Sequence, residues 1–283
     1  MNEPKKLLAV DGSNLLFQMF YGMPARITNS AGRPIHGTLG FIGALLRMIR
    51  SEHPTHVIVL FDGETENPRR ELAPDYKANR PDFSDMPEDE TPFSQLPDVY
   101  AALDAIGIKH AETRDLEADD ILAAYAALGS SDLNVLISSF DSDLFQLIDD
   151  HTSILRYRGD ASKVYTGATV FEKFGVSPSL YADYKALVGD RSDNIAGAPG
   201  IGPKTASALI SEFGSLEKII ASADRIKKDR IRLSVCENKE RLLRNLALIR
   251  LSSDHALPYT LGELSFGACS ESSVSLLKRL GIY

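Results

Sequence analysis

The chain has 283 residues, enough for one large domain or two interlocked ones, and 43% of them are hydrophobic while 25% are charged. These proportions are close to the averages for soluble globular proteins, and they exclude a collagen-like, coiled-coil or disordered chain. The formal net charge of -8 taken alone would argue against a nucleic-acid partner, because affinity for that polyanion comes mainly from Lys and Arg.

Short β-like runs alternate with helical patterns over the first two-thirds of the chain, which predicts a parallel sheet flanked by helices. Three apolar runs, each ending at or shortly before an Asp, are the expected buried strands: Leu7–Val10, Val57–Phe61 and Val135–Ser138. Apolar residues at spacings of three and four predict helices over Leu39–Ile49 and Ile121–Leu128. Ligands of such sheets bind at the carboxyl ends of the strands.

Two later segments depart from this alternation. Residues 64–96 contain five prolines, few aliphatic residues and many charges, which is typical of a mobile functional excursion. After Ser177 the pattern is mostly helical, with a turn rich in Gly and Pro at 197–204. The stretch Arg225–Arg250 then carries nine Lys and Arg residues and is the basic surface of the chain.

Acidic residues recur where the ligand edge of the predicted sheet should lie, at one helix start and in one loop. Nine of them come from five segments: Asp11, Asp62, Glu117, Asp119, Asp120, Asp141, Asp143, Asp190 and Asp193. Each alone has an ordinary explanation, such as a turn or a helix N-terminus. Together they would repel strongly unless cations neutralise them. Leaving these nine charges out of the total of -8 gives +1 for the rest of the chain.

The chemistry of these acids indicates a metal-dependent hydrolase. Carboxylate oxygens without neighbouring Cys or His select Mg²⁺ or Mn²⁺. Two such ions about 4 Å apart activate a water and stabilise the leaving oxygen of a phosphodiester displacement. On the predicted helix, Glu117 and Asp120 can share a face, whereas Asp119 and Asp120 cannot. We therefore expect direct and indirect metal contacts to be divided among them, and the spacing does not assign the roles.

The turn Gly197–Thr205 is not a nucleotide-binding P-loop, because Pro203 separates the last Gly from Lys204. A tight glycine turn before a helix offers backbone N–H groups to a phosphate, and Lys204 adds a charge. It therefore predicts a grip on a DNA backbone without sequence readout. The alternative is an ordinary turn between helices.

The excursion at 64–96 contains a group of cations with one aromatic residue: Arg69, Arg70, Tyr76, Lys77 and Arg80. Scattered charge in a solvated loop is the ordinary explanation. The position directly after Asp62 favours another, because cations there can reach a scissile phosphate and stabilise the negative charge that develops on it.

Over essentially its whole length the chain resembles the 5′-nuclease superfamily of flap endonucleases, specifically the bacterial 5′-3′ exonucleases found as the N-terminal domain of DNA polymerase I. The motifs are VDGSNLLF from Val10, FD at Phe61, RxEL from Arg69, YKANRP from Tyr76, LEADD from Leu116, SFDSDLFQL from Ser139, GDRSDN from Gly189 and the helix-hairpin-helix GAPGIGPKTA from Gly197.

The resemblance implies an α/β fold: a mainly parallel central sheet flanked by helices, a helical arch at about 64–96 and a C-terminal helix-hairpin-helix region. It implies a catalytic core over 1–176, and a DNA-binding region over 177–283 whose C-terminal segment packs back on the core. The implied activity is a divalent-metal-dependent 5′-3′ exonuclease and flap endonuclease that acts on 5′ flaps and on nicked or branched duplex DNA.

The resemblance also implies roles for individual residues. Two Mg²⁺ or Mn²⁺ ions would be held, the first by Asp11, Asp62, Glu117, Asp119 and Asp120, the second by Asp141, Asp143, Asp190 and Asp193. The cations of the arch that contact phosphate would be Arg69, Lys77 and Arg80. The residues that contact DNA would be Tyr76, Gly200, Gly202, Lys204 and Thr205, with a K⁺ ion at the hairpin.

The sequence departs from this family in two places. Ser142 stands where the family usually has Lys between two Asp residues, so one cation near the metals is missing. The stretch Asp82–Glu90 holds five acids and no base, which weakens the expected grip on a 5′ single strand.

Two rival functions remain, a PIN-like ribonuclease and a non-catalytic protein that binds DNA structures. The glycine hairpin with its basic helices favours duplex DNA over RNA, and the complete set of acids favours catalysis. The start of the chain has too few apolar residues for a secretory signal, and Cys236 and Cys269 suggest neither a disulfide framework nor zinc. We therefore expect a cytoplasmic monomer that does not bind membranes.

Overall fold

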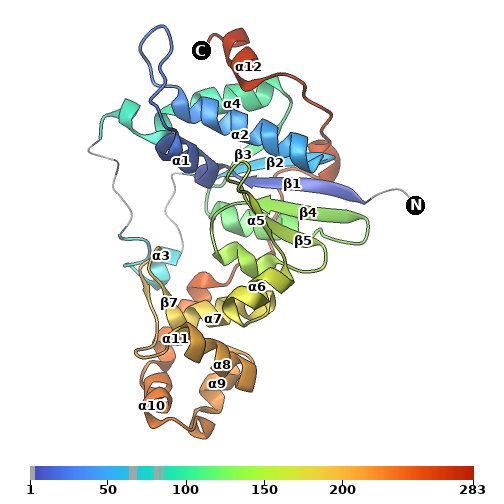
Figure 1. Ribbon diagram of the computed structural model, residues 1–283. Coiled ribbons are helices and arrows are strands. Elements are labelled where there is room, and N and C mark those ends of the chain that lie inside the picture. Colours follow the sequence, from blue (N-terminus) through green and yellow to red (C-terminus); the bar gives the residue numbers. More distant parts are fainter. Residues whose placement is uncertain (1–3, 64–68, 80–82, 84–85) are drawn as a thin grey trace.

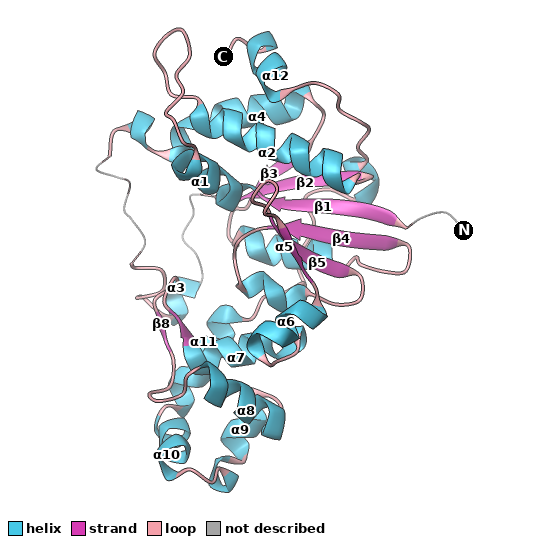
Figure 2. Cartoon of the chain, in the orientation of Figure 1, coloured by secondary structure: helices cyan, strands magenta, loops and turns pink. Residues whose placement is uncertain are grey.

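The computed structural model describes residues 4–63, 69–79, 83 and 86–283 (Figure 1). Its centre is a six-stranded sheet in the order β3-β2-β1-β4-β5-β6, parallel except that β6 runs antiparallel to β5. The strands are β1 (Lys5–Asp11), β2 (His56–Phe61), β3 (Lys109–Glu112), β4 (Leu133–Ser138), β5 (Thr152–Arg156) and β6 (Lys163–Tyr165). Helices cover both faces of this sheet (Figure 2).

The central strands are apolar throughout because each of their faces packs against a different core. In β1, Leu8 and Val10 belong to one core and Leu7 and Ala9 to the other, and all four are fully buried. The helices of the first core are α1 (Gly12–Gly22), α2 (His36–Glu52), α4 (Leu96–Ala105) and α12 (Ser273–Arg279). Because successive side chains of a strand point to opposite faces, each central strand packs against the helices on both faces of the sheet.

The second core begins with α5 and continues into a stack of helices that extends away from the sheet (Figure 1). Its helices are α5 (Ala118–Ala126), α6 (Gly167–Phe174), α7 (Tyr181–Val188), α8 (Pro203–Phe213), α9 (Leu216–Ala221), α10 (Asp229–Glu237) and α11 (Lys239–Ile249). A two-stranded ribbon of β7 (Gly189–Asp190) and β8 (Ile195–Ala196) follows α7. The C-terminal segment then returns to the sheet, where Ser265 bridges His56 and α12 packs near α2.

The predicted fold class is confirmed, and so are the three predicted strands and two predicted helices, which correspond to β1, β2, β4, α2 and α5. Strands β3, β5 and β6 were not predicted. Edge strand β3 has the sequence KHAE and is only partly buried, so it lacks the apolar run that marks a buried strand. In the part of the chain that the structure describes, no helix is long and apolar enough to cross a membrane.

Within the 64–96 segment the described elements are helix α3 (Arg69–Leu72), two 3-10 helices at Glu88–Glu90 and Pro92–Gln95, and the first residue of α4. Residues 64–68, 80–82 and 84–85 lie outside the described residues. The prediction that Arg80 contacts a phosphate therefore falls outside them too.

Candidate active site

The carboxyl edge of the sheet brings three of the predicted acids together. Asp11 is the last residue of β1, Asp62 follows β2, and Asp141 lies just beyond β4. Strands β2, β1 and β4 are neighbours and parallel, so their carboxyl ends meet at one edge. These three acids therefore come to one edge from three consecutive strands of the sheet.

Asp11 is fixed where β1 turns into α1. Its Oδ1 accepts a hydrogen bond of 3.0 Å from the backbone N–H of Asn14, and its Oδ2 accepts one of 2.8 Å from the Ser139 hydroxyl. Burial and the negative charge of Asp62 raise the pKa of Asp11 to about 7. The carboxylate is thus held in place, but its charge is not compensated by the chain around it.

The start of α5 divides its acids between two directions. Arg69 forms ion pairs with both Glu117 and Asp120, which confirms that these two residues share a face. Asp119 lies on another face, where burial and the charges of Asp141 and Asp11 raise its pKa. Asp119 therefore joins the acids at the carboxyl edge, while Glu117 and Asp120 are paired with the guanidinium of Arg69.

A second acidic group is formed by Asp143, Asp190 and Asp193, each of which offers an oxygen within 4.8 Å of the others. Burial raises the pKa of Asp143 to about 7, although the positive charge of Lys185 acts to lower it. Burial also acts against ionisation of Asp190, but Lys185 and hydrogen bonds from Ser192 outweigh it and lower the pKa of Asp190.

Lys185 is a site residue that the sequence reasoning missed. It lies on α7, is 5% exposed, and forms ion pairs with Asp143 and Asp190. Its Nζ also lies 3.2 Å from the hydroxyl of Ser142, to which it donates a hydrogen bond. A cation thus reaches the position that the Asp-Ser-Asp motif seemed to leave without one. A Lys at a core-facing position of α7 was the available signal, because buried Lys is rare unless it is paired.

The described part of the 64–96 segment packs against these acids. Tyr76 is 4% exposed and donates a hydrogen bond to Glu117, and Lys77 forms an ion pair with the same carboxylate. The backbone N–H of Lys77 donates to the carbonyl of Asp193 at 3.1 Å. The Asn79 side chain donates to the carbonyl of Arg191 at 2.8 Å. Three of the predicted cationic and aromatic residues, Arg69, Tyr76 and Lys77, therefore lie beside the acids.

The glycine hairpin lies in the helical stack, before α8. Gly200 has φ +77°, and a Cβ built on it would lie 2.6 Å from Nη2 of Arg230 on α10. Gly202 precedes the first residue of α8 with ordinary extended backbone, and Lys204 is exposed while Thr205 is half-buried. The predicted hairpin residues thus form one turn, and Arg230 of the basic stretch lies beside Gly200.

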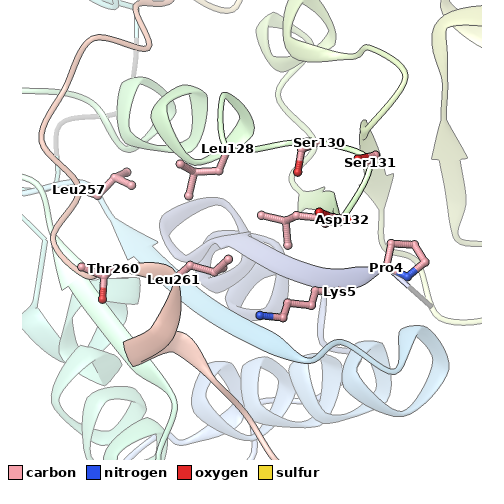
Figure 3. Close-up of a pocket in the computed structure, with 10 residues that line it drawn as sticks. Pro4, Lys5, Leu128, Ser130, Ser131, Asp132, Leu257, Thr260 and Leu261 are labelled. Carbon is pink, nitrogen blue, oxygen red and sulfur yellow. The ribbon is translucent and has the colours of Figure 1, made fainter. Parts of the chain in front are cut away.

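A hollow of about 720 Å³ lies at the opposite edge of the sheet (Figure 3). Lys5 and Leu133, the first residues of β1 and β4, line it together with Leu128, Leu257 and Leu261. It is separated from the acids by the length of the strands and belongs to a different part of the molecule.

The acids fit divalent metal ions rather than another ligand. All nine are oxygen donors of the hard kind that Mg²⁺ and Mn²⁺ prefer. Burial and the charge of Asp62 raise the pKa of Asp11, and a bound cation would favour its ionised form. Fold and site together define a carboxylate-edged α/β protein of the metal-dependent nuclease class.

Comparison with known proteins gives the family. The N-terminal resolvase-like domain model of 5′-3′ exonucleases matches residues 6–175, and the C-terminal SAM-fold model of 5′-3′ exonucleases matches residues 176–272. The chain therefore belongs to the 5′-3′ exonuclease family, whose members are metal-dependent 5′-3′ exonucleases and flap endonucleases, and the predicted resemblance is confirmed.

DNA polymerase I of Bacillus subtilis is 33% identical over 289 residues, which cover 99% of this chain and 32% of the polymerase. The chain thus spans about a third of that relative. The T5 D15 protein co-crystallised with metal ions is 27% identical, with a TM-score of 0.72 over 87% of this chain and 89% of that one. The bacteriophage T5 D15 flap endonuclease in a pseudo-enzyme-product complex with DNA and metal ions gives a TM-score of 0.69, with the same identity and coverage.

Proposed function

We propose that this chain hydrolyses DNA phosphodiesters at 5′ ends and at branched junctions, as a structure-specific 5′-3′ exonuclease and flap endonuclease. The observation that carries the proposal is the meeting of the acids from β1, β2, β4 and α5 with Arg69 and Lys77 at one edge of the sheet. The T5 structure with DNA and metal ions supports DNA as the substrate.

The metals are proposed to be two Mg²⁺ or Mn²⁺ ions. Asp11, Asp62, Glu117, Asp119 and Asp120 would hold one, and Asp141, Asp143, Asp190 and Asp193 the other. Bound ions of this kind supply an activated water and stabilise the leaving oxygen of a phosphodiester. The divergent faces of α5 suggest that Asp119 contacts an ion directly while Glu117 and Asp120 act with Arg69 around it.

The cations of the 64–96 segment are proposed to contact the scissile phosphate. Arg69 and Lys77 both bind Glu117, so they lie at the border of the acidic edge rather than out in solvent. Two connections hold this border together: the Lys77 backbone bond to Asp193 and the Tyr76 bond to Glu117. A preformed position is what electrostatic stabilisation of a transition state requires. Arg80 is proposed to contact the scissile phosphate as well.

The hairpin is proposed to hold the duplex through its backbone. The turn that contains Gly200 and Gly202 has no bulky side chains at these two positions, and Gly202 is exposed. Lys204 adds one exposed ammonium group, and Thr205 follows it on α8. Backbone N–H groups at a helix start suit a phosphate. Backbone carbonyls of the turn suit K⁺, the ion that the family resemblance implies there. These contacts position DNA without reading its sequence.

Cleavage of a labelled 5′-flap DNA tests this function against its rivals. The flap DNA, its RNA analogue and a blunt duplex are each incubated with Mg²⁺ or with EDTA. We expect the flap DNA to be cleaved in Mg²⁺ and to remain intact in EDTA. Preferential cleavage of the RNA would support the PIN-like ribonuclease instead, and metal-independent binding without cleavage would support the non-catalytic binder.

We also propose that the chain acts as a monomer in the cytoplasm, with a catalytic core over 1–176 and a DNA-binding region over 177–283. The proposal is supported by the helical stack that carries the hairpin and by a resemblance to enzymes that act on DNA.

A further inference from the structure

The connection between β5 and β6, residues 157–162, also reaches the carboxyl edge of the sheet. Strand β5 is parallel to β4, so both strands end on the side where Asp141 lies. The carbonyl of Tyr157 accepts a hydrogen bond of 2.8 Å from the side chain of Gln18, which holds the connection beside α1 (Figure 1). The connection is thus anchored on the α1 side of the edge, whereas the helices that carry the hairpin belong to the core on the other face of the sheet and extend away from it.

This connection has a defined backbone. The N–H of Arg158 donates to the hydroxyl of Ser162 at 2.8 Å, and that hydroxyl donates to the carbonyl of Gly159 at 2.6 Å. Ser162 therefore closes the turn from its side chain. The side chain of Arg158 therefore extends from a fixed backbone position.

Two arginines from this connection and its strand flank Phe140, the residue directly before Asp141. The guanidinium of Arg156 lies 5.9 Å from the Phe140 ring centre and that of Arg158 lies 5.0 Å from it. Arg156 also donates to the Phe140 carbonyl at 2.9 Å and lies 4.6 Å from the ring of Phe145. Cation–π contacts of this kind orient a guanidinium without neutralising its charge.

The charge of Arg158 remains available. Its side chain is exposed, and among the described residues it forms no ion pair with any carboxylate, although it belongs to an acidic protein and lies near an acidic edge. Arg156, in contrast, is half-buried by its aromatic neighbours and serves to hold Phe140. An oriented, exposed and uncompensated guanidinium fits an anion, and its planar donors match phosphate oxygens.

We propose that Arg158 binds a backbone phosphate of the DNA arm that lies across the junction from the hairpin. This inference rests on the proposed nuclease function. The hairpin and the basic helices would hold one duplex arm from one face of the sheet, and Arg158 would hold the second arm from the α1 side. The two contacts together favour a substrate with two arms over a single duplex with a 5′ overhang.

The test compares two DNA substrates that carry the same 5′ flap, one with a second duplex arm across the junction and one without it. Binding is measured with Ca²⁺ in place of Mg²⁺ over a range of salt concentrations, and single-turnover cleavage is measured in Mg²⁺. The variants are Arg158→Ala and Arg158→Lys. Lys173→Ala is the matched control, because Lys173 is also an exposed cation that rests on aromatic rings, but it lies on α6.

We expect Arg158→Ala to weaken binding of the two-armed substrate about ten-fold, the effect of losing one charged hydrogen bond. The slope of log affinity against log salt should fall by about one unit for that substrate. The one-armed substrate should be unaffected, and Arg158→Lys should keep the salt slope. Lys204→Ala at the hairpin should weaken both substrates alike.

An equal effect of Arg158→Ala on the two substrates, or no effect, would overturn the inference, and so would an equal loss in Lys173→Ala. Thermal unfolding of each variant shows whether it folds as the wild type does. A wild-type protein that cleaves neither substrate in Mg²⁺ would instead overturn the proposed nuclease function.

Discussion

A hydrogen bond from the backbone of Asp143 to the carboxylate of Asp141 holds these two acids together just beyond β4. The N–H of Asp143 donates to Oδ1 of Asp141 at 2.8 Å, and the N–H of Asp141 donates to the Ser139 hydroxyl at 3.0 Å. Ser139 in turn donates to Asp11. A chain of hydrogen bonds therefore connects this turn to the acid at the end of β1.

Replacing both Asp141 and Asp143 with Ala is expected to abolish cleavage while DNA binding survives. The metal ligands are lost, but repulsion between carboxylates and phosphates falls as well. Single-turnover cleavage and equilibrium binding of one flap DNA measure the two effects. The matched control replaces the exposed acids Asp132 and Asp150, which removes the same charge elsewhere. Cleavage at the wild-type rate by the Asp141/Asp143 variant would show that these acids are not metal ligands.

Lys77 combines three features that an ordinary loop cation lacks. It has a positive φ of 56°, its ammonium lies 4.9 Å from the ring centre of Tyr76, and it is bound to Glu117. Positive φ in a non-glycine residue costs about 1–2 kcal/mol, so the surrounding contacts must maintain it. The side chain is thus directed to the acids by the fold.

Replacing Lys77 with Ala is expected to slow the chemical step by about 10²–10³-fold, because one preorganised charge is removed from the transition state. Single-turnover cleavage with saturating enzyme measures that step apart from binding. Lys109→Ala is a suitable control, since Lys109 also rests on an aromatic ring, that of Tyr259, but lies at the start of β3. A rate within a few-fold of wild type would reduce Lys77 to a structural residue.

At the scale of elements, two glycines of the hairpin differ in what requires them. Gly200 needs its left-handed backbone and has no room for a Cβ beside Arg230, whereas Gly202 has extended backbone and open space around it. The first glycine is required by the protein itself. The second is free of protein contacts, which suits a position that a phosphate approaches.

Gly200→Ala is therefore expected to lower the free energy of unfolding by about 1–2 kcal/mol. Gly202→Ala should leave stability unchanged and still weaken DNA binding, because its methyl group would stand between the backbone and a phosphate. Chemical unfolding and DNA binding of both variants test this pair. Full DNA affinity in the Gly202 variant would indicate that DNA does not approach this turn.

The sequence predicts those elements whose pattern is set by burial on both faces. Strands β1, β2 and β4 are continuous apolar runs, and the acids at their ends follow from the topology alone. Edge strand β3 carries no such pattern. Lys185 has only the weak signal of a Lys at a core-facing helix position, because one of its two partners, Asp143, lies 42 residues away in the sequence. Arg158 likewise depends on β5 ending beside Phe140.

For the molecule as a whole, the acidic edge is a concentration of charge that opposes folding. Asp11 and Asp143 have pKa values raised from 3.8 to about 7 in the folded protein, mainly by burial. In the unfolded chain both would ionise near pH 4. Between these values the folded state binds more protons than the unfolded state, so stability falls as the pH rises.

The metal-free protein should therefore lose thermal stability between pH 5 and pH 7.5. One unit of pKa shift corresponds to about 1.4 kcal/mol, so a change in Tm of several degrees is expected. Asp190, whose pKa is lowered, is ionised in both states over this range and does not oppose the trend. His36 and His56, whose pKa values are lowered by burial, act against it, so the contribution of the acids is read from a comparison with a variant. Mg²⁺ or Mn²⁺ at pH 7.5 should restore the Tm, because a cation that binds only the folded state stabilises it.

Thermal unfolding in EDTA at a series of pH values, with and without added Mg²⁺, measures both effects. Asp11→Asn provides the comparison, because its amide keeps the size and shape of the side chain but carries no charge at any pH. Its Tm should depend less on pH than that of the wild type and should rise less on adding metal. The same dependence of Tm on pH in the wild type and in Asp11→Asn would contradict the view that buried acids at the carboxyl edge destabilise the metal-free fold.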